Sequence, residues 1–337
     1  MQLNSSSIPK LWAGVDLAKA TFSAALWGHL ELRDMHTQTF KRTREGAAAF
    51  LAWLHANAEP SFSIGIVMEA TATFGTELAG WIQDLESGLY IAIANPKNTS
   101  HHISSLGLRN KTDGLDARGL AKYGAERKPI AWEKPSPERM ALQDLLRTRT
   151  DLVNTRVAMT LRLEDHTRTS KAAMKAMAAV IRTLETQISA LEKETHQLLG
   201  TCGELGRQVK RLASITGVGV ITAATVLSEL GDLRRFPRSR QLTAFAGVSP
   251  KLKESGTSVR GKTKLCKEGS ARVRAVLYLA ACSAVRFNPD MKEVYDRLVA
   301  AGKPRRSALG AVMRKLLVLM RAVLVADHDW IRRTRVA

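Results

Sequence analysis

The chain has 337 residues and a net charge of +20, which allows two or three domains with sizeable cores and favours nucleic acid over a membrane surface as the partner. Its three cysteines are too far apart to form a zinc-binding motif, so they are expected to be reduced thiols. Charged residues interrupt the first and the last apolar runs, which excludes a signal peptide and a membrane-spanning helix. We therefore expect a soluble cytoplasmic protein of bacterial type, associated with the nucleoid when it is active.

The positive charge is concentrated in the C-terminal part of the sequence. Residues 201–337 contain 27 lysines and arginines against 10 acids, a net charge of +17. Residues 1–100 contain 7 basic and 9 acidic residues, a net charge of −2. A surface that binds phosphates requires such a local excess, so residues 201–337 are expected to carry most of the affinity for nucleic acid.

The N-terminal third alternates between strand and helix patterns. Apolar runs typical of strands cover residues 11–16, 22–27, 37–40, 62–68 and 89–94. Helical patterns cover residues 46–56 and 76–85, and an Asn95-Pro96 stop follows the last strand. Three strands in a meander, followed by helices that alternate with strands, predict an α/β layer with a mixed sheet.

Four acids are placed where this layer would bind a ligand. Asp16 and Glu69 each end a predicted strand, at the rim where open α/β sheets hold ligands. Asp113 and Asp116 are three residues apart at the start of a helix and therefore share a face. That pair alone is also typical of an ordinary helix N-terminus. Together, however, four converging carboxylates repel one another unless they hold a hard cation such as Mg²⁺, the metal of much phosphodiester chemistry.

The middle of the chain, residues 137–200, has the pattern of long helices. Apolar residues recur at helical spacing with one interruption near residues 167–170. An antiparallel helical hairpin or a coiled coil between subunits fits this pattern, and so does an amphipathic helix pair packed on its own domain. The small net charge of this region argues against a role as the main DNA-binding surface.

The C-terminal part contains two stretches of chemical interest. Residues 212–231, LASITGVGVITAATVLSELG, resemble a helix–hairpin–helix element, whose glycines let backbone N–H groups approach a phosphate, although this pattern alone is weak. Residues 249–267 form a basic loop in which Ser255 follows Glu254. Such a serine more often contacts phosphate than attacks it. Helices are expected over residues 241–246, 270–286, 290–301 and 304–326.

Several longer stretches are recognisable when taken together. They are GVDLAKATFSAALW, MEATATFG, NPKNTSHHISSLGLRNKTDGLDARGLAKY, ITGVGVITAATVLSELGD, LTAFAGVSPKLKESGTSVRGKTKLCKEG and GAVMRKL. In this order they resemble the insertion-sequence transposases of the DEDD/serine type, the IS one-ten family of bridge-RNA-guided recombinases. The resemblance spans almost the whole chain and includes the motifs of both of that family's domains.

The resemblance implies a fold and a set of site residues. It implies an α/β RuvC-like (ribonuclease-H-like) domain over residues 1–136, a helical coiled-coil region for oligomerisation over 137–200, and a mostly α, basic transposase domain over 201–337. The catalytic carboxylates, which would hold Mg²⁺ or Mn²⁺, fall on Asp16, Glu69, Asp113 and Asp116. The catalytic serine falls on Ser255, and the nearby basic residues expected to bind nucleic acid are Arg260, Lys262, Lys264 and Lys267.

The resemblance also implies partners. A structured non-coding guide RNA would pair with donor and target DNA and thereby read most of the sequence. The chain would act as a dimer or tetramer, with the RuvC-like domain of one subunit facing the serine of another. The expected activity is a DNA recombinase or transposase that works through a phosphoserine intermediate. The competing hypotheses are a RuvC-like, Mg²⁺-dependent, structure-selective endonuclease that uses activated water, and a basic chromosomal DNA-binding protein with structural acids.

Overall fold

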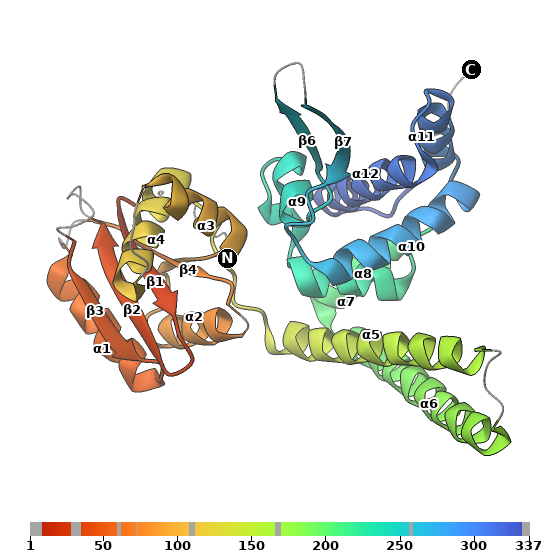
Figure 1. The fold of residues 1–337 in the computed structure, drawn as a ribbon, viewed down its shortest axis with the longest axis horizontal. Coiled ribbons are helices and arrows are strands. Elements are labelled where there is room, and N and C mark those ends of the chain that lie inside the picture. Colours follow the sequence, from red (N-terminus) through yellow and green to blue (C-terminus); the bar gives the residue numbers. More distant parts are fainter. Residues whose placement is uncertain are drawn as a thin grey trace. The chain divides into compact units, whose positions relative to one another are not determined.

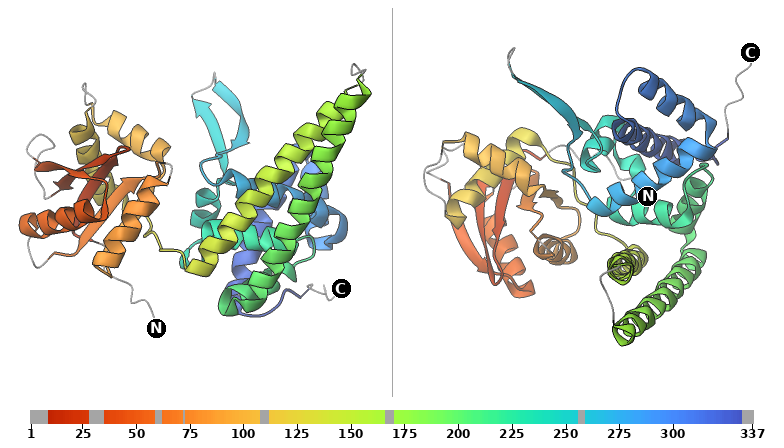
Figure 2. Two further views of the ribbon diagram at one scale, coloured as in Figure 1. Left: turned by 90° about the horizontal axis from the view of Figure 1, so that it is seen from below. Right: turned by 45° about the vertical axis from the view of Figure 1, so that its right-hand side comes forward.

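The computed structural model describes residues 9–27, 35–58, 62–71, 73–107, 112–165, 170–255 and 259–331, and the side chains of residues 252–264 lie outside this description. The chain forms two compact units, Met1–Lys134 and Pro135–Ala337, coloured along the sequence in Figures 1 and 2. The sequence predicts that residues 137–200 form a helical region of their own between the two domains, and this stays a prediction.

The N-terminal unit is built on a mixed five-stranded sheet with the order β3-β2-β1-β4-β5. Its strands are β1 (Leu11–Leu17), β2 (Thr21–Trp27), β3 (Thr37–Lys41), β4 (Ile64–Glu69) and β5 (Tyr90–Ala94). The first three pair antiparallel, whereas β4 runs parallel to β1 and β5 runs parallel to β4. The mixed α/β layer that the sequence predicts is therefore present, with each strand within a few residues of its expected position.

Helices cover both faces of this sheet (Figure 1). Helices α1 (Arg44–Asn57) and α2 (Phe74–Leu85) pack on one face through a core that contains Phe50 and Ile82. Helices α3 (Pro96–Ser105) and α4 (Asp113–Arg127) cover the other face, where Trp12 and Leu120 are buried. Strands covered on both faces read as continuous apolar runs, which explains why LWAGVDL has a single half-buried residue, Asp16.

Helix α3 departs from the sequence prediction, in which Asn95-Pro96 was a stop. In the structure the Asn95 side chain caps the helix by accepting the N–H of Lys97 at 2.9 Å, and Pro96 occupies its first turn. Proline suits this position because the first N–H groups of a helix have no intrahelical partner to lose. The dipeptide that ends β5 therefore also starts a helix.

The C-terminal unit begins with a long antiparallel helix pair, α5 (Pro137–Leu163) and α6 (Lys171–Thr201). Arg149 Nε donates to Glu192 at 2.7 Å, and Arg156 lies 4.0 Å from Glu185 further along, so the residue numbers run in opposite directions across the pair. The free end projects away from the other helices of the unit (Figures 1 and 2). The helical hairpin is thus present within one chain, and its pairing with a second subunit stays a prediction.

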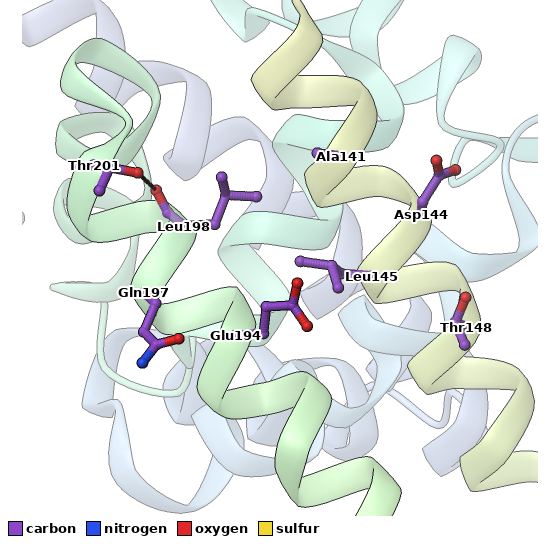
Figure 3. A pocket seen from close by; sticks show the side chains of 8 residues that line it. All are labelled: Ala141, Asp144, Leu145, Thr148, Glu194, Gln197, Leu198 and Thr201. Atoms are coloured by element: carbon purple, nitrogen blue, oxygen red, sulfur yellow. Dashed lines mark hydrogen bonds between the residues drawn. The ribbon is translucent and has the colours of Figure 1, made fainter.

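The two helices separate near their base and leave an open hollow between them. The residues around it are Ala141, Asp144, Leu145 and Thr148 of α5, and Glu194, Gln197, Leu198 and Thr201 of α6 (Figure 3). On the side of the unit's core, Leu142 and Leu146 are fully buried. Leu142 and Leu146 of α5 therefore anchor the helix pair on the core, and α6 adds the buried residues Ile188 and Thr195.

The remaining helices surround one large core. They are α7 (Gly203–Ala213), α8 (Val220–Leu230), the short 3-10 helix η2 (Leu233–Arg235), α9 (Ser239–Phe245), α10 (Ala271–Phe287), α11 (Pro289–Ala300) and α12 (Arg305–Ala326). The predominantly helical C-terminal part is as predicted, although the first helix before the Gly-Val-Gly turn lies at Gly203–Ala213. No helix in the described residues is long and apolar enough to cross a membrane.

The Gly-Val-Gly turn has a packing role. Gly217 adopts φ +99°, and a Cβ there would lie 2.6 Å from the Cα of Ala284 in α10. Only glycine tolerates both the left-handed conformation and so close a neighbour. Contact with α10 is therefore sufficient to explain the first glycine of this turn, and a bound phosphate is not needed to explain it.

The basic stretch that the sequence predicts as a loop is a two-stranded hairpin, β6 (Pro250–Ser255) and β7 (Val259–Leu265). The strands are antiparallel, with Ser255 opposite Val259 and Glu254 opposite Arg260. The loop prediction was wrong because these strands lack the apolar alternation of a sheet with one buried face. Gly256, Thr257 and Ser258 lie outside the described residues.

Candidate active site

The register of the central strands brings two of the predicted acids together. Val15 of β1 pairs with Met68 of β4 in a parallel ladder, so the next residues, Asp16 and Glu69, lie side by side at the ends of adjacent strands. The C-terminal end of β4 is also paired, since Glu69 lies opposite Ala94 of β5. Both acids are half-buried. This pairing places both acids at one rim of the sheet, as the sequence predicts.

Helix α4 brings the other two acids to the same rim. Asp113 and Asp116 lie in its first turn, after the N-cap Thr112. The helix packs directly on β1 at Gly14, where a Cβ would lie 2.1 Å from the carbonyl oxygen of Ala117. Such an approach is open only to glycine. Gly14 therefore lets the helix that carries two acids lie against the strand that carries Asp16.

The other three acids influence the pKa of Asp16. Its pKa is raised from 3.8 to about 6, first by burial and then by the negative charges of Asp116, Asp113 and Glu69, while a hydrogen bond from the Leu17 backbone opposes the shift. Among the described residues no basic side chain contributes to lowering it. We call Asp16, Glu69, Asp113 and Asp116 the acid cluster, since the negative charges of the other three act on Asp16 and no basic side chain of the described residues offsets them there.

A buried threonine holds one carboxylate of the cluster. The Thr99 side chain, in α3, is fully buried and its hydroxyl donates to Glu69 Oε1. No sequence motif identified this contact, because α3 itself was missed. If Asn95-Pro96 is taken as a helix start, Thr99 falls one turn inside it, on the side that α3 presents to the end of β4.

The donors of the cluster suit a hard divalent cation. All four predicted ligands are carboxylates, which Mg²⁺ and Mn²⁺ prefer to nitrogen or sulfur, and Asp16 lacks a compensating positive charge in the described part of the chain. Within the same residues no three His, Cys, Asp or Glu side chains are close enough to form a ready-made metal-binding group. The fit to a hard cation therefore rests on the carboxylate donors and on the rim that they share.

A polar cavity adjoins the cluster at Asp113. It has a volume of about 530 Å³ and is lined by Ser23 of β2, by Thr37, Gln38 and Thr39 of β3, and by Thr112, Asp113 and Gly114 at the start of α4. The Ser23 and Thr39 hydroxyls are 3.0 Å apart and share a hydrogen bond. The cavity offers hydroxyl and amide groups beside the acids, on the edge strand of the sheet.

The predicted serine lies in the other unit. Ser255 is the last residue of β6, and the side chains of Ser255, Arg260, Lys262 and Lys264 lie outside the described residues. The base of this hairpin is fixed, since Cys266 N–H donates to Ser249 O at 2.9 Å and Lys267 N–H to Gly247 O at 3.2 Å. Lys267 is exposed at this base, and Leu265 packs beside Gly310 of α12.

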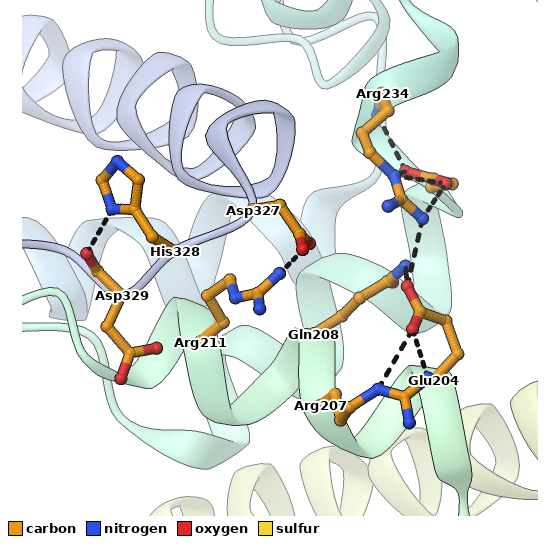
Figure 4. Close-up of polar contacts among 9 residues, drawn as sticks. Glu204, Arg207, Gln208, Arg211, Arg234, Asp327, His328 and Asp329 are labelled. Atoms are coloured by element: carbon orange, nitrogen blue, oxygen red, sulfur yellow. Dashed lines mark hydrogen bonds and ion pairs between the residues drawn. The ribbon is translucent and has the colours of Figure 1, made fainter.

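Ion pairs occupy many arginines of the C-terminal unit. Glu204 accepts from Arg207 at 2.8 Å and from Arg234 at 3.2 Å, and Arg211 pairs with Asp327 (Figure 4). In contrast, no acid of the described chain lies within ion-pair distance of several exposed basic residues on α9 and α12. These are Arg240, Arg305, Arg306, Arg314 and Lys315. The exposed basic residues that are available to bind a polyanion therefore lie on α9 and α12, the two helices that pack near the hairpin.

Comparisons with known proteins place the chain in a family. Residues 13–171, which include all four acids, match the DEDD-type IS110 transposases, and residues 209–296, which include Ser255, match the transposase family IS116/IS110/IS902. The pilin gene-inverting protein of Moraxella bovis is 28% identical over 96% of this chain and 98% of its own length. The transposase of insertion sequence IS1111A from Coxiella burnetii is 23% identical over 94% and 90%. The chain belongs to the IS110 family of transposases and is a DNA recombinase of that family.

Proposed function

We propose that this transposase cuts and rejoins donor and target DNA through Ser255, assisted by a divalent cation at the four carboxylates and guided by a structured non-coding RNA. The observation that carries the proposal is that the register of β1 on β4 and the packing of α4 on Gly14 place the four acids at one rim, where the charges of the other three help to raise the pKa of Asp16. The strand order β3-β2-β1-β4-β5, with acids at the ends of β1 and β4, supports a RuvC-like domain. A purely structural role would not require so much uncompensated charge at one rim.

The serine chemistry explains how strands rejoin without an external energy source. The Ser255 hydroxyl oxygen attacks the scissile phosphorus and loses its proton to water or a carboxylate. The bond from phosphorus to one sugar oxygen breaks, and that oxygen takes up a proton from water and leaves as a hydroxyl. The resulting phosphoserine ester keeps the phosphate transferable. The hydroxyl of the partner strand then attacks the same phosphorus, and the serine oxygen departs and regains a proton.

The acid cluster supports this reaction through its charge. Asp16, Glu69, Asp113 and Asp116 would hold Mg²⁺ or Mn²⁺, which neutralises negative charge on the phosphate as the reaction proceeds. Lys267 and the basic residues Arg260, Lys262 and Lys264 of β7 would hold the DNA backbone at the hairpin. The resemblance to the family implies a composite site, in which the acids of one subunit face the serine of another and the helix pair α5–α6 joins the subunits.

The decisive experiment looks for the covalent intermediate. Protein is incubated with its RNA and with end-labelled DNA that carries a nick to trap the intermediate, and the products are separated under denaturing conditions. Wild-type protein should shift the label by its own mass, and peptide mapping should locate a phosphoserine at Ser255. Ser255→Ala should lose the adduct, cleavage and recombination together while still binding DNA and RNA.

A matched control separates a nucleophile from a phosphate contact. Ser249 lies near the base of the same hairpin, with its hydroxyl 3.0 Å from that of Thr243, so Ser249→Ala should keep the adduct. The four carboxylate-to-alanine variants should also lose cleavage, but not DNA binding. Free cleaved ends without an adduct, or full activity in Ser255→Ala, would instead favour the endonuclease with activated water.

RNA guidance has its own test. A structured RNA should co-purify with the full chain expressed together with the DNA that flanks its gene, and sequencing should reveal segments complementary to donor and target. Altering those segments should redirect recombination to matching DNA. Recombination of the original target by RNA-free protein would contradict guidance without touching the serine chemistry.

A further inference from the structure

One carboxylate of the cluster has a dedicated hydrogen-bond donor. Thr99 is 0% exposed, and its hydroxyl donates to Glu69 Oε1 across the boundary between α3 and β4. A buried side chain of this kind cannot exchange its partner for water. The hydroxyl is therefore committed either to Glu69 or to a backbone carbonyl of its own helix.

The alternatives within α3 are close at hand. Thr99 Oγ1 lies 2.9 Å from the carbonyl oxygen of Pro96 and 3.4 Å from that of Asn95. A hydroxyl has a single hydrogen, so it can donate fully to only one of these three acceptors. The bond to Glu69 joins α3 to the end of β4, whereas the two carbonyl oxygens belong to the start of the helix itself.

The local sequence accounts for the position of Thr99. Asn95 caps α3 and Pro96 begins it, immediately after β5 ends at Ala94. Ala94 pairs with Glu69, so the first turn of α3 starts beside the end of β4. The residue one turn further on, Thr99, then faces the Glu69 side chain. A helix that started elsewhere would not bring a hydroxyl to this carboxylate.

We propose that Thr99 is a positioning residue that orients Glu69 for the divalent cation. This inference rests on the proposed metal site. By binding Oε1, Thr99 restricts the rotation of the carboxylate and leaves Oε2 available for the cation. Hydrogen-bonded partners of metal ligands contribute in this way, and their loss typically costs about 10–100-fold in metal affinity or activity.

The test compares two substitutions of Thr99 in the full chain. Thr99→Val keeps the shape of the side chain and removes the hydroxyl, whereas Thr99→Ser keeps the hydroxyl. We expect Thr99→Val to weaken Mn²⁺ binding, measured by titration calorimetry, by about 10-fold or more, and Thr99→Ser to bind within about 3-fold of wild type. Ser100→Ala, at the exposed next position of α3, serves as the control and should bind as wild type.

The readouts separate positioning from folding and from the function itself. The metal-free unfolding midpoints of Thr99→Val and Thr99→Ser should be similar, while the gain in midpoint on adding Mn²⁺ should be smaller for Thr99→Val. Equal Mn²⁺ affinities for the two variants would overturn the role of Thr99. If wild-type protein and Glu69→Ala bind Mn²⁺ equally, the metal site itself fails, which is a different result.

Discussion

At the scale of single residues, the chemistry of Asp16 is set by its neighbours. An isolated aspartate ending a strand would be ionised well below neutral pH, but here burial and three acids raise the pKa to about 6. The charged neighbours come from two other elements, Glu69 from β4 and the two aspartates from α4. Such a cluster costs folding stability and is retained where a cation or a substrate compensates it.

This cost predicts a pH dependence of stability in metal-free protein. Unfolded Asp16 loses its proton near 3.8 and folded Asp16 near 6, so between these values the folded state binds more protons and stability falls as pH rises. Asp16→Asn removes this loss. We measure the free energy of unfolding by urea in the presence of a chelator. From about pH 4 to 7 the value for Asp16→Asn should rise relative to that of wild type by about 1–2 kcal/mol, after allowance for solvent screening.

The matching control in this experiment is the addition of Mn²⁺ at the higher pH. The proposed cation would compensate the charge of Asp16, so wild type should recover stability on its addition and Asp16→Asn should recover less. Parallel pH profiles of wild type and Asp16→Asn without metal would mean that the acid cluster does not raise the pKa of Asp16.

At the scale of elements, the contact between β1 and α4 decides whether the cluster forms. Gly14 has no side chain because the backbone of α4 occupies that space, and a Cβ there would lie 2.1 Å from Ala117 O and 2.2 Å from Ala121 N. Backbone atoms cannot yield as the end of a flexible side chain can. Any larger residue must therefore push α4, and with it Asp113 and Asp116, away from Asp16.

Gly14→Ala is accordingly expected to damage both stability and the site. Overpacking of this kind costs about 1–3 kcal/mol, and here it should also weaken Mn²⁺ binding. Gly80→Ala is the matched control, because Gly80 lies in α2 with nothing within 4 Å of an added Cβ. It should leave metal binding unchanged and raise stability by about 0.5–1 kcal/mol. Urea unfolding and calorimetry of both variants check this, and a harmless Gly14→Ala would contradict the packing argument.

At the scale of the whole molecule, acidic and basic functions are divided along the chain. Residues 1–100 have a net charge of −2 and residues 201–337 a net charge of +17. Part of the basic charge is internally neutralised, as at Arg207 and Arg211, whereas Arg314 and Lys315 on α12 are exposed without an acid of the described chain in ion-pair distance. The count of basic residues therefore overstates the charge available to DNA.

Salt dependence distinguishes these two kinds of basic residue. Replacing Arg314 and Lys315 by alanine should weaken non-specific duplex binding and lower the slope of log affinity against log salt by about 0.9 for each phosphate that the protein no longer neutralises. Arg207→Ala, which removes an ion-paired charge, should change the slope much less. Fluorescence anisotropy over a salt series measures both, and an unchanged slope in the α12 variant would place the DNA elsewhere.

Much of this protein follows from the sequence alone. The apolar runs around Asp16 and Glu69 predict buried strands that end on acids, and the charge count predicts where the basic part lies, because both depend on residue type and local order. The structure was needed where distant segments meet. It decided that Asn95-Pro96 starts a helix, that the stretch before Ser255 is a strand, and that Gly217 packs against Ala284. The register of β1 on β4 and the packing of α4 on Gly14 bring the acids together, whereas the pairing of β5 with β4 and the start of α3 bring Thr99 to Glu69. Such contacts depend on three-dimensional packing that no local pattern encodes.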